Sequence, residues 1–167
     1  MKKSENNYAF IALAVFVYLA AYRTPVAPVQ VSPTAEFGGV SLRIEYATTS
    51  EARERGLGGR TEIQEDYGML FVFPKSDYYG FWMRDTLVSL DIFWLDNSAG
   101  GGPASGGKGQ LAVVSMMTDV ATSTYPHVFY PTVPARYVLE TASGFARTNN
   151  IATGTFLQLK NPELVSE

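Results

Sequence analysis

The stretch that decides the fold is residues 68–95, GMLFVFPKSDYYGFWMRDTLVSLDIFWL. Apolar and aromatic residues dominate it, but charged residues and Pro74 interrupt them at short intervals. This pattern is too broken for a membrane span and too apolar for a surface loop, so it predicts three short strands that fold back on one another. We expect them at residues 69–73, 80–85 and 90–95, and we expect Pro74 to end the first.

The flanking sequence continues this β pattern. Residues 40–46 alternate between apolar and polar side chains, which predicts a half-buried strand. Thr48 and Glu51 fit a capping box for a short helix that runs through Arg55 and stops at Gly56. Further strands are expected at residues 111–116, 135–140 and 155–159, with a second short helix capped by Thr141 or Ser143. The prediction is a mainly β, compact sandwich or barrel-like domain with two short covering helices, preceded by an N-terminal hydrophobic helix.

Residues 97–110 form a glycine-rich insertion in this pattern. We interpret the insertion as a lengthened hairpin connection between the strands at 90–95 and 111–116, because the entropic cost of closing a loop grows slowly with its length. A phosphate-binding loop would need Ser or Thr after Lys108 and a helix pattern beyond it, and neither is present.

The N-terminus resembles a targeting segment. Lys2 and Lys3 precede residues 8–22, which carry no charge. The length of this segment lies between that of a signal-peptide core and that of a spanning helix, so residues 1–23 are expected to be a signal anchor or a cleaved signal peptide. The expected partner of residues 8–22 is the membrane, with the following domain outside the cytoplasm. The remaining boundaries are a proline-rich linker at 24–37, the domain at 38–162 and a tail at 163–167.

Composition excludes several functions. The chain has 167 residues, 46% of them hydrophobic, and it has no cysteine, so disulfides, thiolate catalysis and cysteine metal sites are excluded. Without Lys2, Lys3, Arg23 and Glu5, ten basic and fifteen acidic residues remain, a net charge of about −5. No basic run is present, so nucleic acid is not an expected partner.

The best candidates for ligand binding lie in the expected strand 80–85. Period two places Trp82 and Arg84 on one face of that strand. An indole beside a guanidinium group could stack on a sugar or hold an anionic group, and Arg60 could add a second donor. The alternative interpretation is that Trp82 belongs to the core and Arg84 neutralises Asp91.

Three acidic residues beside aromatic ones are the candidate acid–base groups: Asp85, Asp91 and Glu140. Two of them at a suitable separation could hydrolyse a glycosidic bond, and burial would raise the pKa of one. The competing interpretation is structural, with Asp91 and Glu140 paired to Arg60, Arg84 or Arg136.

Other chemistries have weaker support. His127 is the single histidine and sits in an expected loop, and there is no Gly-x-Ser-x-Gly turn for a nucleophilic serine. Metal-ligand spacings such as HExxH are missing, so no metal site and no cofactor are predicted.

The order of motifs resembles the domain-of-unknown-function family 192, a group of small, largely secreted or membrane-anchored proteins of bacteria and archaea. The matching residues are Arg53-x-x-Gly56-Leu57-x-x-Arg60, Gly68-Met69-Leu70-Phe71-x-Phe73 and Phe81-Trp82-Met83-Arg84-Asp85-Thr86-x-x-x-Leu90-Asp91, followed by residues 135–140, Gly144 and Gly154. Asp85 and Ser89 depart from the family pattern, which has Asn and Pro there. The resemblance implies a compact β domain and brings no established activity, cofactor or catalytic residue.

Two functional classes follow. The first is a non-catalytic module that binds a small polar ligand, a glycan or an envelope partner. The second is a carboxylate-dependent hydrolase of envelope polysaccharide, which would need two unpaired carboxylates in one cleft. The residues favour the first class, and the catalytic residues of the second stay unknown.

Overall fold

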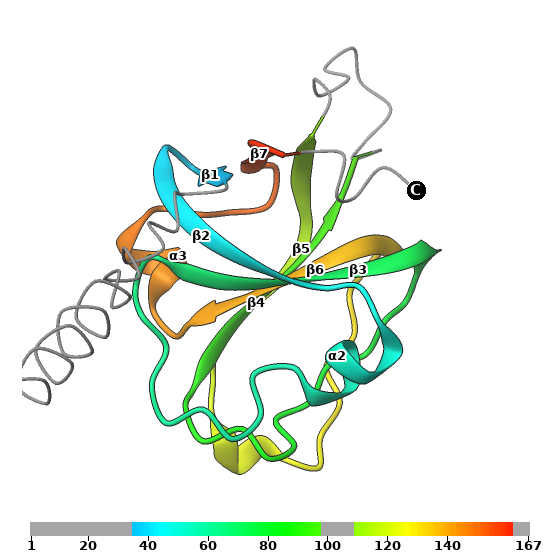
Figure 1. Cartoon of the computed structure of the whole chain (residues 1–167), viewed down its shortest axis with the longest axis vertical. Helices are drawn as coiled ribbons and strands as arrows, with labels where there is room; N and C mark the ends of the chain where they lie inside the picture. The colour runs from blue at the N-terminus through cyan, green and yellow to red at the C-terminus, as the bar shows by residue number, and fades with distance from the viewer. Residues whose placement is uncertain (1–34, 98–108, 162–167) are drawn as a thin grey trace, which may run out of the picture. The chain divides into compact units, whose positions relative to one another are not determined.

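The computed structural model describes residues 35–97 and 109–161 (Figure 1). The N-terminal segment 8–22, most of the linker, most of the glycine-rich insertion and the tail lie outside these residues. Among the described residues, no helix has the length and apolar character needed to cross a membrane.

The described residues form a closed barrel of seven strands. In chain order the strands are β1 (Ala35–Phe37), β2 (Val40–Ala47), β3 (Tyr67–Asp77), β4 (Leu90–Asp96), β5 (Gln110–Val120), β6 (Ala135–Ala142) and β7 (Phe156–Leu159). Around the barrel they run β1-β2-β3-β6-β4-β5-β7, and β7 closes it by pairing with β1. The pairing of β2 with β3 is parallel, and the other named pairs are antiparallel. The mainly β prediction is therefore confirmed, and its barrel alternative is the observed form.

The helical elements are short. Helix α2 spans Ser50–Arg55, a 3-10 turn η1 spans Thr122–Thr124, and helix α3 spans Phe145–Thr148. The N-cap of α2 is Thr49, whose hydroxyl accepts the Ala52 N–H, so the predicted cap at Thr48 is wrong by one residue. The N-cap of α3 is Gly144, with left-handed backbone and no side-chain cap, rather than Thr141 or Ser143.

Alternate strand residues build two apolar cores. The first lies inside the barrel, where Phe37 contacts the rings of Phe93 and Phe145. The second lies on the outer face of β3, β6 and β4, where Ile92, Trp94 and Val138 pack beneath α2 and two long loops (Figure 1). All seven residues of β4 are buried because both of its faces are covered, which explains why its sequence is almost continuously apolar.

Three details of the decisive stretch differ from the prediction. Residues 80–85 form a loop and not a strand, with a single β-bridge between Phe81 and Phe129. Strand β3 continues past Pro74 to Asp77 because its register with β6 shifts between Val72 and Asp77, which frees Pro74 from the need to donate a ladder hydrogen bond. Strands β3 and β4 are separated by β6 instead of pairing with each other.

Strand β1 occupies the last residues of the range expected to be linker.

Candidate functional site

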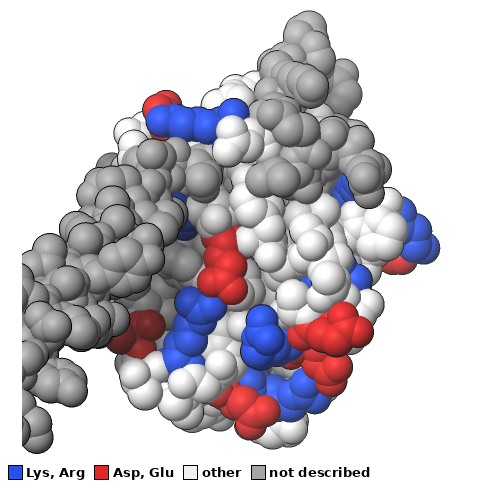
Figure 2. Space-filling model, viewed as in Figure 1, with Lys and Arg blue, Asp and Glu red and all other residues white. Residues whose placement is uncertain are grey.

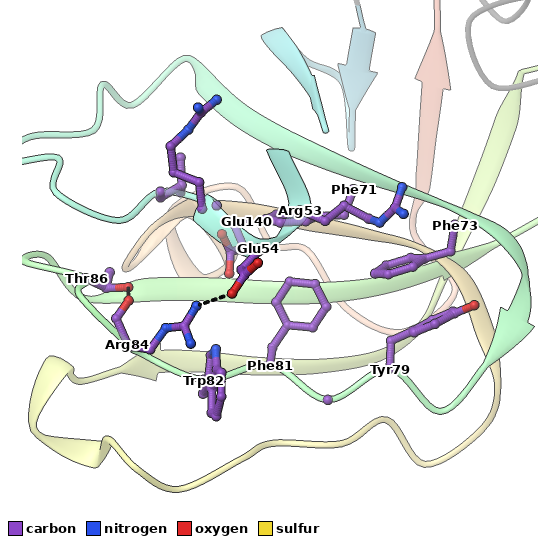
Figure 3. Close-up of a pocket in the computed structure, with 14 residues that line it drawn as sticks. Arg53, Glu54, Phe71, Phe73, Tyr79, Phe81, Trp82, Arg84, Thr86 and Glu140 are labelled. Carbon is purple, nitrogen blue, oxygen red and sulfur yellow. Dashed lines mark hydrogen bonds and ion pairs between the residues drawn. The ribbon is translucent and has the colours of Figure 1, made fainter. Parts of the chain in front are cut away.

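A pocket with a volume of about 240 Å³ opens on the outer face of the barrel. One wall is α2 with the turn that follows it, the other is the loop of residues 78–89, and the floor comes from β3 and β6 (Figure 3). Five aromatic side chains line it: Phe71, Phe73, Tyr79, Phe81 and Trp82. The pocket therefore combines apolar walls with a few polar groups, the composition typical of small-molecule sites.

The first wall depends on the turn at Gly56. This residue ends α2 with φ +50, a conformation that favours glycine. A Cβ atom on Gly56 would lie 3.4 Å from the Phe71 ring and 3.8 Å from the Glu140 carboxyl group. The backbone at Gly56 thus passes directly over the floor, and the buried Leu57 that follows holds the turn against the outer core.

Arg53 fastens α2 to the sheet. Its guanidinium group donates to the Thr48 carbonyl at 2.6 Å and to the Val72 carbonyl at 2.9 Å, and it lies over the Phe73 ring. Phe73 in turn stacks on Tyr79, with ring centroids 3.6 Å apart. Arg53 therefore sets the width of the pocket on this side and has fewer N–H groups left for a ligand.

The second wall is the loop of residues 78–89. Two backbone hydrogen bonds of 2.8 Å join Phe81 to Phe129, and Phe81 and Met83 point into the outer core. The intervening Trp82 and the following Arg84 point outward, and the Trp82 side chain is 43% exposed. Residues 80–85 therefore do alternate between buried and exposed side chains, as predicted. Beyond Phe81, however, the backbone of this segment pairs with no described strand.

Glu140 forms the polar floor of the pocket. It lies on β6 directly opposite Met69 of β3 and Ile92 of β4, so apolar side chains flank it on both sides. It is only 4% exposed, and no hydrogen bond or ion pair joins its carboxyl group to another described residue. Burial raises its pKa to about 8, because desolvation penalises the charged form. At neutral pH this carboxyl group is mainly protonated and faces the pocket (Figure 3).

An ion pair joins the two walls. The Arg84 guanidinium group lies 3.2 Å from a carboxylate oxygen of Glu54 on α2, and it also lies over the Trp82 indole at 4.9 Å from the ring centroid (Figure 3). The Glu54 side chain is 73% exposed and the Arg84 side chain 34%. Figure 2 shows acidic and basic side chains intermixed over the region of α2. The Trp82 indole thus orients Arg84, and the ionic partner of Arg84, Glu54, is largely exposed to solvent.

The structure brings together three of the residues singled out from sequence and separates the others. Trp82, Arg84 and Glu140 line the same pocket. Arg60 does not line it, because its guanidinium group donates to Glu45 at 2.8 Å and lies over the Tyr67 ring. The Asp85 backbone has a positive φ, and its side chain is exposed. A carboxylate oxygen of Asp85 lies 3.9 Å from Nε of the neighbouring Arg84.

Asp91 has a structural environment. It is fully buried on the barrel-facing side of β4, where its carboxylate accepts the Asp119 N–H and the Ala146 N–H, each at 2.8 Å. The expected ion pairs between Asp91 or Glu140 and Arg60, Arg84 or Arg136 are not formed. Arg136 instead donates its side-chain N–H to the Phe73 carbonyl and its backbone N–H to Asp96.

The pocket also contains residues that the sequence interpretation did not select. Arg53, Glu54, Phe73 and Tyr79 line it. The sequence signal for Arg53 was its place in the motif Arg53-x-x-Gly56-Leu57. In the structure, the residues of this motif hold α2 and the turn after it against the outer face of the sheet. No comparable signal marked Glu54, since an exposed acid on a helix is common.

His127 lies outside the pocket lining, against an aromatic side chain. The His127 ring packs edge-on against Phe129, with centroids 4.6 Å apart, in the loop that precedes β6. Within residues 35–97 and 109–161, no group of three or more His, Asp or Glu side chains converges as metal ligands would.

Comparison with known proteins supports the resemblance drawn from the motifs. Residues 33–100 match the model of the family described as Uncharacterized ACR, COG1430 (DUF192). This match covers both walls of the pocket and the floor residue Phe71, and it confirms the resemblance drawn from the motif spacing. No curated protein matches the chain.

Two solved structures are similar in fold. One is from Sinorhizobium meliloti 1021 and is described as a "putative transcription regulator"; it has a TM-score of 0.62 and 23% identity, over 78% of this chain and 97% of that one. The other, from Novosphingobium aromaticivorans DSM 12444, is described as a protein of unknown function; it has a TM-score of 0.60 and 25% identity, over 80% of this chain and 90% of that one. These similarities establish a shared barrel and bring no activity with them.

Proposed function

We propose that the chain is a non-catalytic binding module that holds a small polar ligand in the pocket between α2 and residues 78–89. The observation that carries the proposal is the unpartnered Glu140 carboxyl group at the floor of an aromatic pocket. A buried polar group without a partner costs about 1–3 kcal/mol, and a ligand group that hydrogen-bonds to it recovers part of that cost.

The remaining lining supports the same function. Trp82 and Phe81 offer aromatic surface to an apolar ligand face, while Arg84 offers a pre-oriented cation at the opening. Arg53 and Gly56 hold the first wall in place, so the pocket exists before a ligand arrives. Sites that are largely formed in advance lose less free energy on binding.

We further propose that this module acts outside the cytoplasm. Residues 8–22 are uncharged and follow Lys2 and Lys3, the pattern of a signal anchor or signal peptide. The partner at that end of the chain would be the membrane, and the ligand would be a sugar, a glycan fragment or another component of the envelope. Fusion of a reporter enzyme after residue 161 tests this placement: activity of a reporter that works only in the cytoplasm would contradict it.

A thermal-shift screen of the full-length protein against envelope sugars and small anions tests the binding function. A ligand should raise the melting temperature of the wild type, and Arg84→Ala and Glu140→Leu should each remove most of that increase while the variants stay folded. Arg147→Ala is the control, because this arginine pairs with Asp119 away from the pocket. Loss of folding in Arg84→Ala would make this arginine a scaffold residue and would contradict the assigned site.

The hydrolase alternative has less support. Asp85 and Asp91 do not share the pocket with Glu140, and the second acid in the lining is Glu54, which pairs with Arg84. A hydrolase would therefore need Glu54 and Glu140 together as base and acid. Release of reducing ends from envelope polysaccharide, abolished by either Glu54→Gln or Glu140→Gln, would favour this alternative over simple binding.

A further inference from the structure

We propose that the ligand of this pocket is a single-ring sugar acid: its carboxylate replaces Glu54 on Arg84, and its hydroxyl groups hydrogen-bond to the Glu140 carboxyl group. This inference rests on the proposed binding function and specifies the chemical class of the ligand. Each part of it follows from one feature of the lining.

The carboxylate is assigned from Arg84. Its guanidinium group is fixed over the Trp82 ring, and both of its ionic partners are largely exposed: Glu54 at 3.2 Å, 73% exposed, and Asp85 at 3.9 Å, 85% exposed. Exposed ion pairs contribute about 0–1 kcal/mol, so a ligand can displace Glu54 at little cost. A planar guanidinium group binds carboxylates through two parallel hydrogen bonds, which a ligand carboxylate inside the pocket can form in place of the single contact to Glu54.

The surrounding charges favour an anion. The charged and titratable groups that line the pocket with Glu140 are Arg53, Glu54 and Arg55 from α2 and its end, and Tyr79 and Arg84 from residues 78–89. The strands on either side of Glu140 place only Met69 and Ile92 opposite it. With Glu140 protonated, three basic groups face a single acidic one, so an anionic ligand is attracted and a cationic ligand is not.

The hydroxyl groups are assigned from Glu140. A protonated carboxyl group has one donor and remaining acceptor sites, and a sugar hydroxyl group also both donates and accepts. The two can therefore pair without moving a charge into the buried floor. An ammonium group would instead require Glu140 to ionise in an apolar environment, which burial opposes.

The single ring is assigned from size and wall chemistry. A volume of about 240 Å³ lies below the usual range of about 300–1,000 Å³ for pockets that take drug-sized ligands. The ring face of a sugar is weakly polar and can cover the aromatic walls formed by Phe81 and Trp82, while its edge presents the hydroxyl groups. A longer glycan would reach the pocket only with its terminal ring.

Three sugars of the same ring size test the class: glucuronate, glucose and glucosamine carry a negative, a neutral and a positive group. Calorimetric titration of the full-length protein at pH 6 should give glucuronate an affinity at least about tenfold above the other two, equivalent to about 1.4 kcal/mol. Arg84→Met should reduce the affinity for glucuronate to that for glucose, whereas Arg147→Met should leave the affinity for glucuronate unchanged.

The floor is tested by pH. At pH 9 Glu140 is ionised, so the affinity for glucuronate should fall by about tenfold or more, and Glu140→Gln should remove this dependence. Equal affinities for the three sugars, tighter binding of glucosamine, or no binding of any of them would overturn the sugar-acid assignment. A pocket ligand of another class, whose thermal shift is lost in Glu140→Leu, would then leave the binding function standing. If no ligand's thermal shift changed in Glu140→Leu or in Arg84→Ala, both the sugar-acid assignment and the binding function would be overturned.

Discussion

Asp91 and Glu140 lie on opposite faces of the sheet formed by β4 and β6. Asp91 is paired across the strands with Thr141, and Glu140 with Ile92, so the two carboxyl groups point away from each other. Asp91 faces the barrel interior and accepts two backbone N–H groups, whereas Glu140 faces the pocket and accepts no hydrogen bond from another described residue. Asp91 is a structural acceptor, and Glu140 is the acid that lines the pocket.

The stability of the domain should fall as pH rises from about 4.5 to about 8. The pKa of Glu140 is raised from 4.5 to about 8 in the folded state, so in this range the unfolded chain has lost a proton that the folded chain keeps. Ionisation thus favours unfolding, by an amount on the order of 3–5 kcal/mol for this shift. Chemical denaturation at pH 5 and pH 8.5 measures the difference.

Glu140→Gln provides the matched comparison for that measurement. Glutamine cannot ionise, so the variant should match the wild type at pH 5 and exceed its free energy of unfolding at pH 8.5. An identical decrease with pH in both proteins would show that the dependence arises from other groups and that Glu140 is not held neutral.

Replacement of Asp91 by alanine should destabilise the domain strongly. The change leaves the Asp119 and Ala146 N–H groups without their acceptor in a buried site, at about 1–3 kcal/mol for each. We expect a loss of about 3–5 kcal/mol in the free energy of unfolding, measured by urea denaturation. Asp66→Ala is the control, because that acid pairs with Arg43 at an exposed position and should cost less than about 1 kcal/mol.

Replacement of Arg60 by alanine should leave ligand binding unchanged. Its guanidinium group is engaged by Glu45 at 2.8 Å and by the Tyr67 ring, outside the pocket lining. The pair is partly exposed, so we expect a stability cost of about 1 kcal/mol or less. Titration of Arg60→Ala and Arg84→Ala with the same ligand separates the two arginines, and a weakened Arg60→Ala variant would return Arg60 to the site.

Replacement of Gly68 by alanine should destabilise the sheet. A Cβ atom there would lie 2.8 Å from a methyl group of Leu139 and 3.2 Å from one of Leu42. Overpacking of this kind costs about 1–3 kcal/mol. Thermal denaturation measures it, and a variant as stable as the wild type would mean that the Leu139 and Leu42 side chains shift to accept the added methyl group.

The sequence predicted local structure well where burial follows a simple period. The alternating residues 40–46 lie in β2, and the strands predicted at residues 90–95 and 135–140 correspond to β4 and β6. The same rule failed at residues 80–85, because a loop that covers a sheet also alternates between packed and exposed side chains: Phe81 and Met83 pack inward while Trp82 and Arg84 do not. Burial alone does not distinguish a covering loop from a paired strand.

The sequence pattern did not predict which strands lie next to each other in the barrel. Nothing in residues 67–77 indicates a parallel partner in β2, and nothing in β6 indicates that it inserts between β3 and β4. The pocket depends on this insertion, since it places Glu140 beneath Gly56 and between the two walls. The motif residues identified the walls, and only the strand order identified the floor.

The pairing that closes the barrel joins its first and last strands, with Ala35 directly opposite Leu159. The chain therefore enters and leaves the folded domain at adjacent points. Such a domain can be inserted into a surface loop of a host protein with little distortion of the host, because the two junctions need not be far apart. Deletion of residues 35–37, by contrast, would leave β7 without a partner on one side and expose a sheet edge to association with other chains.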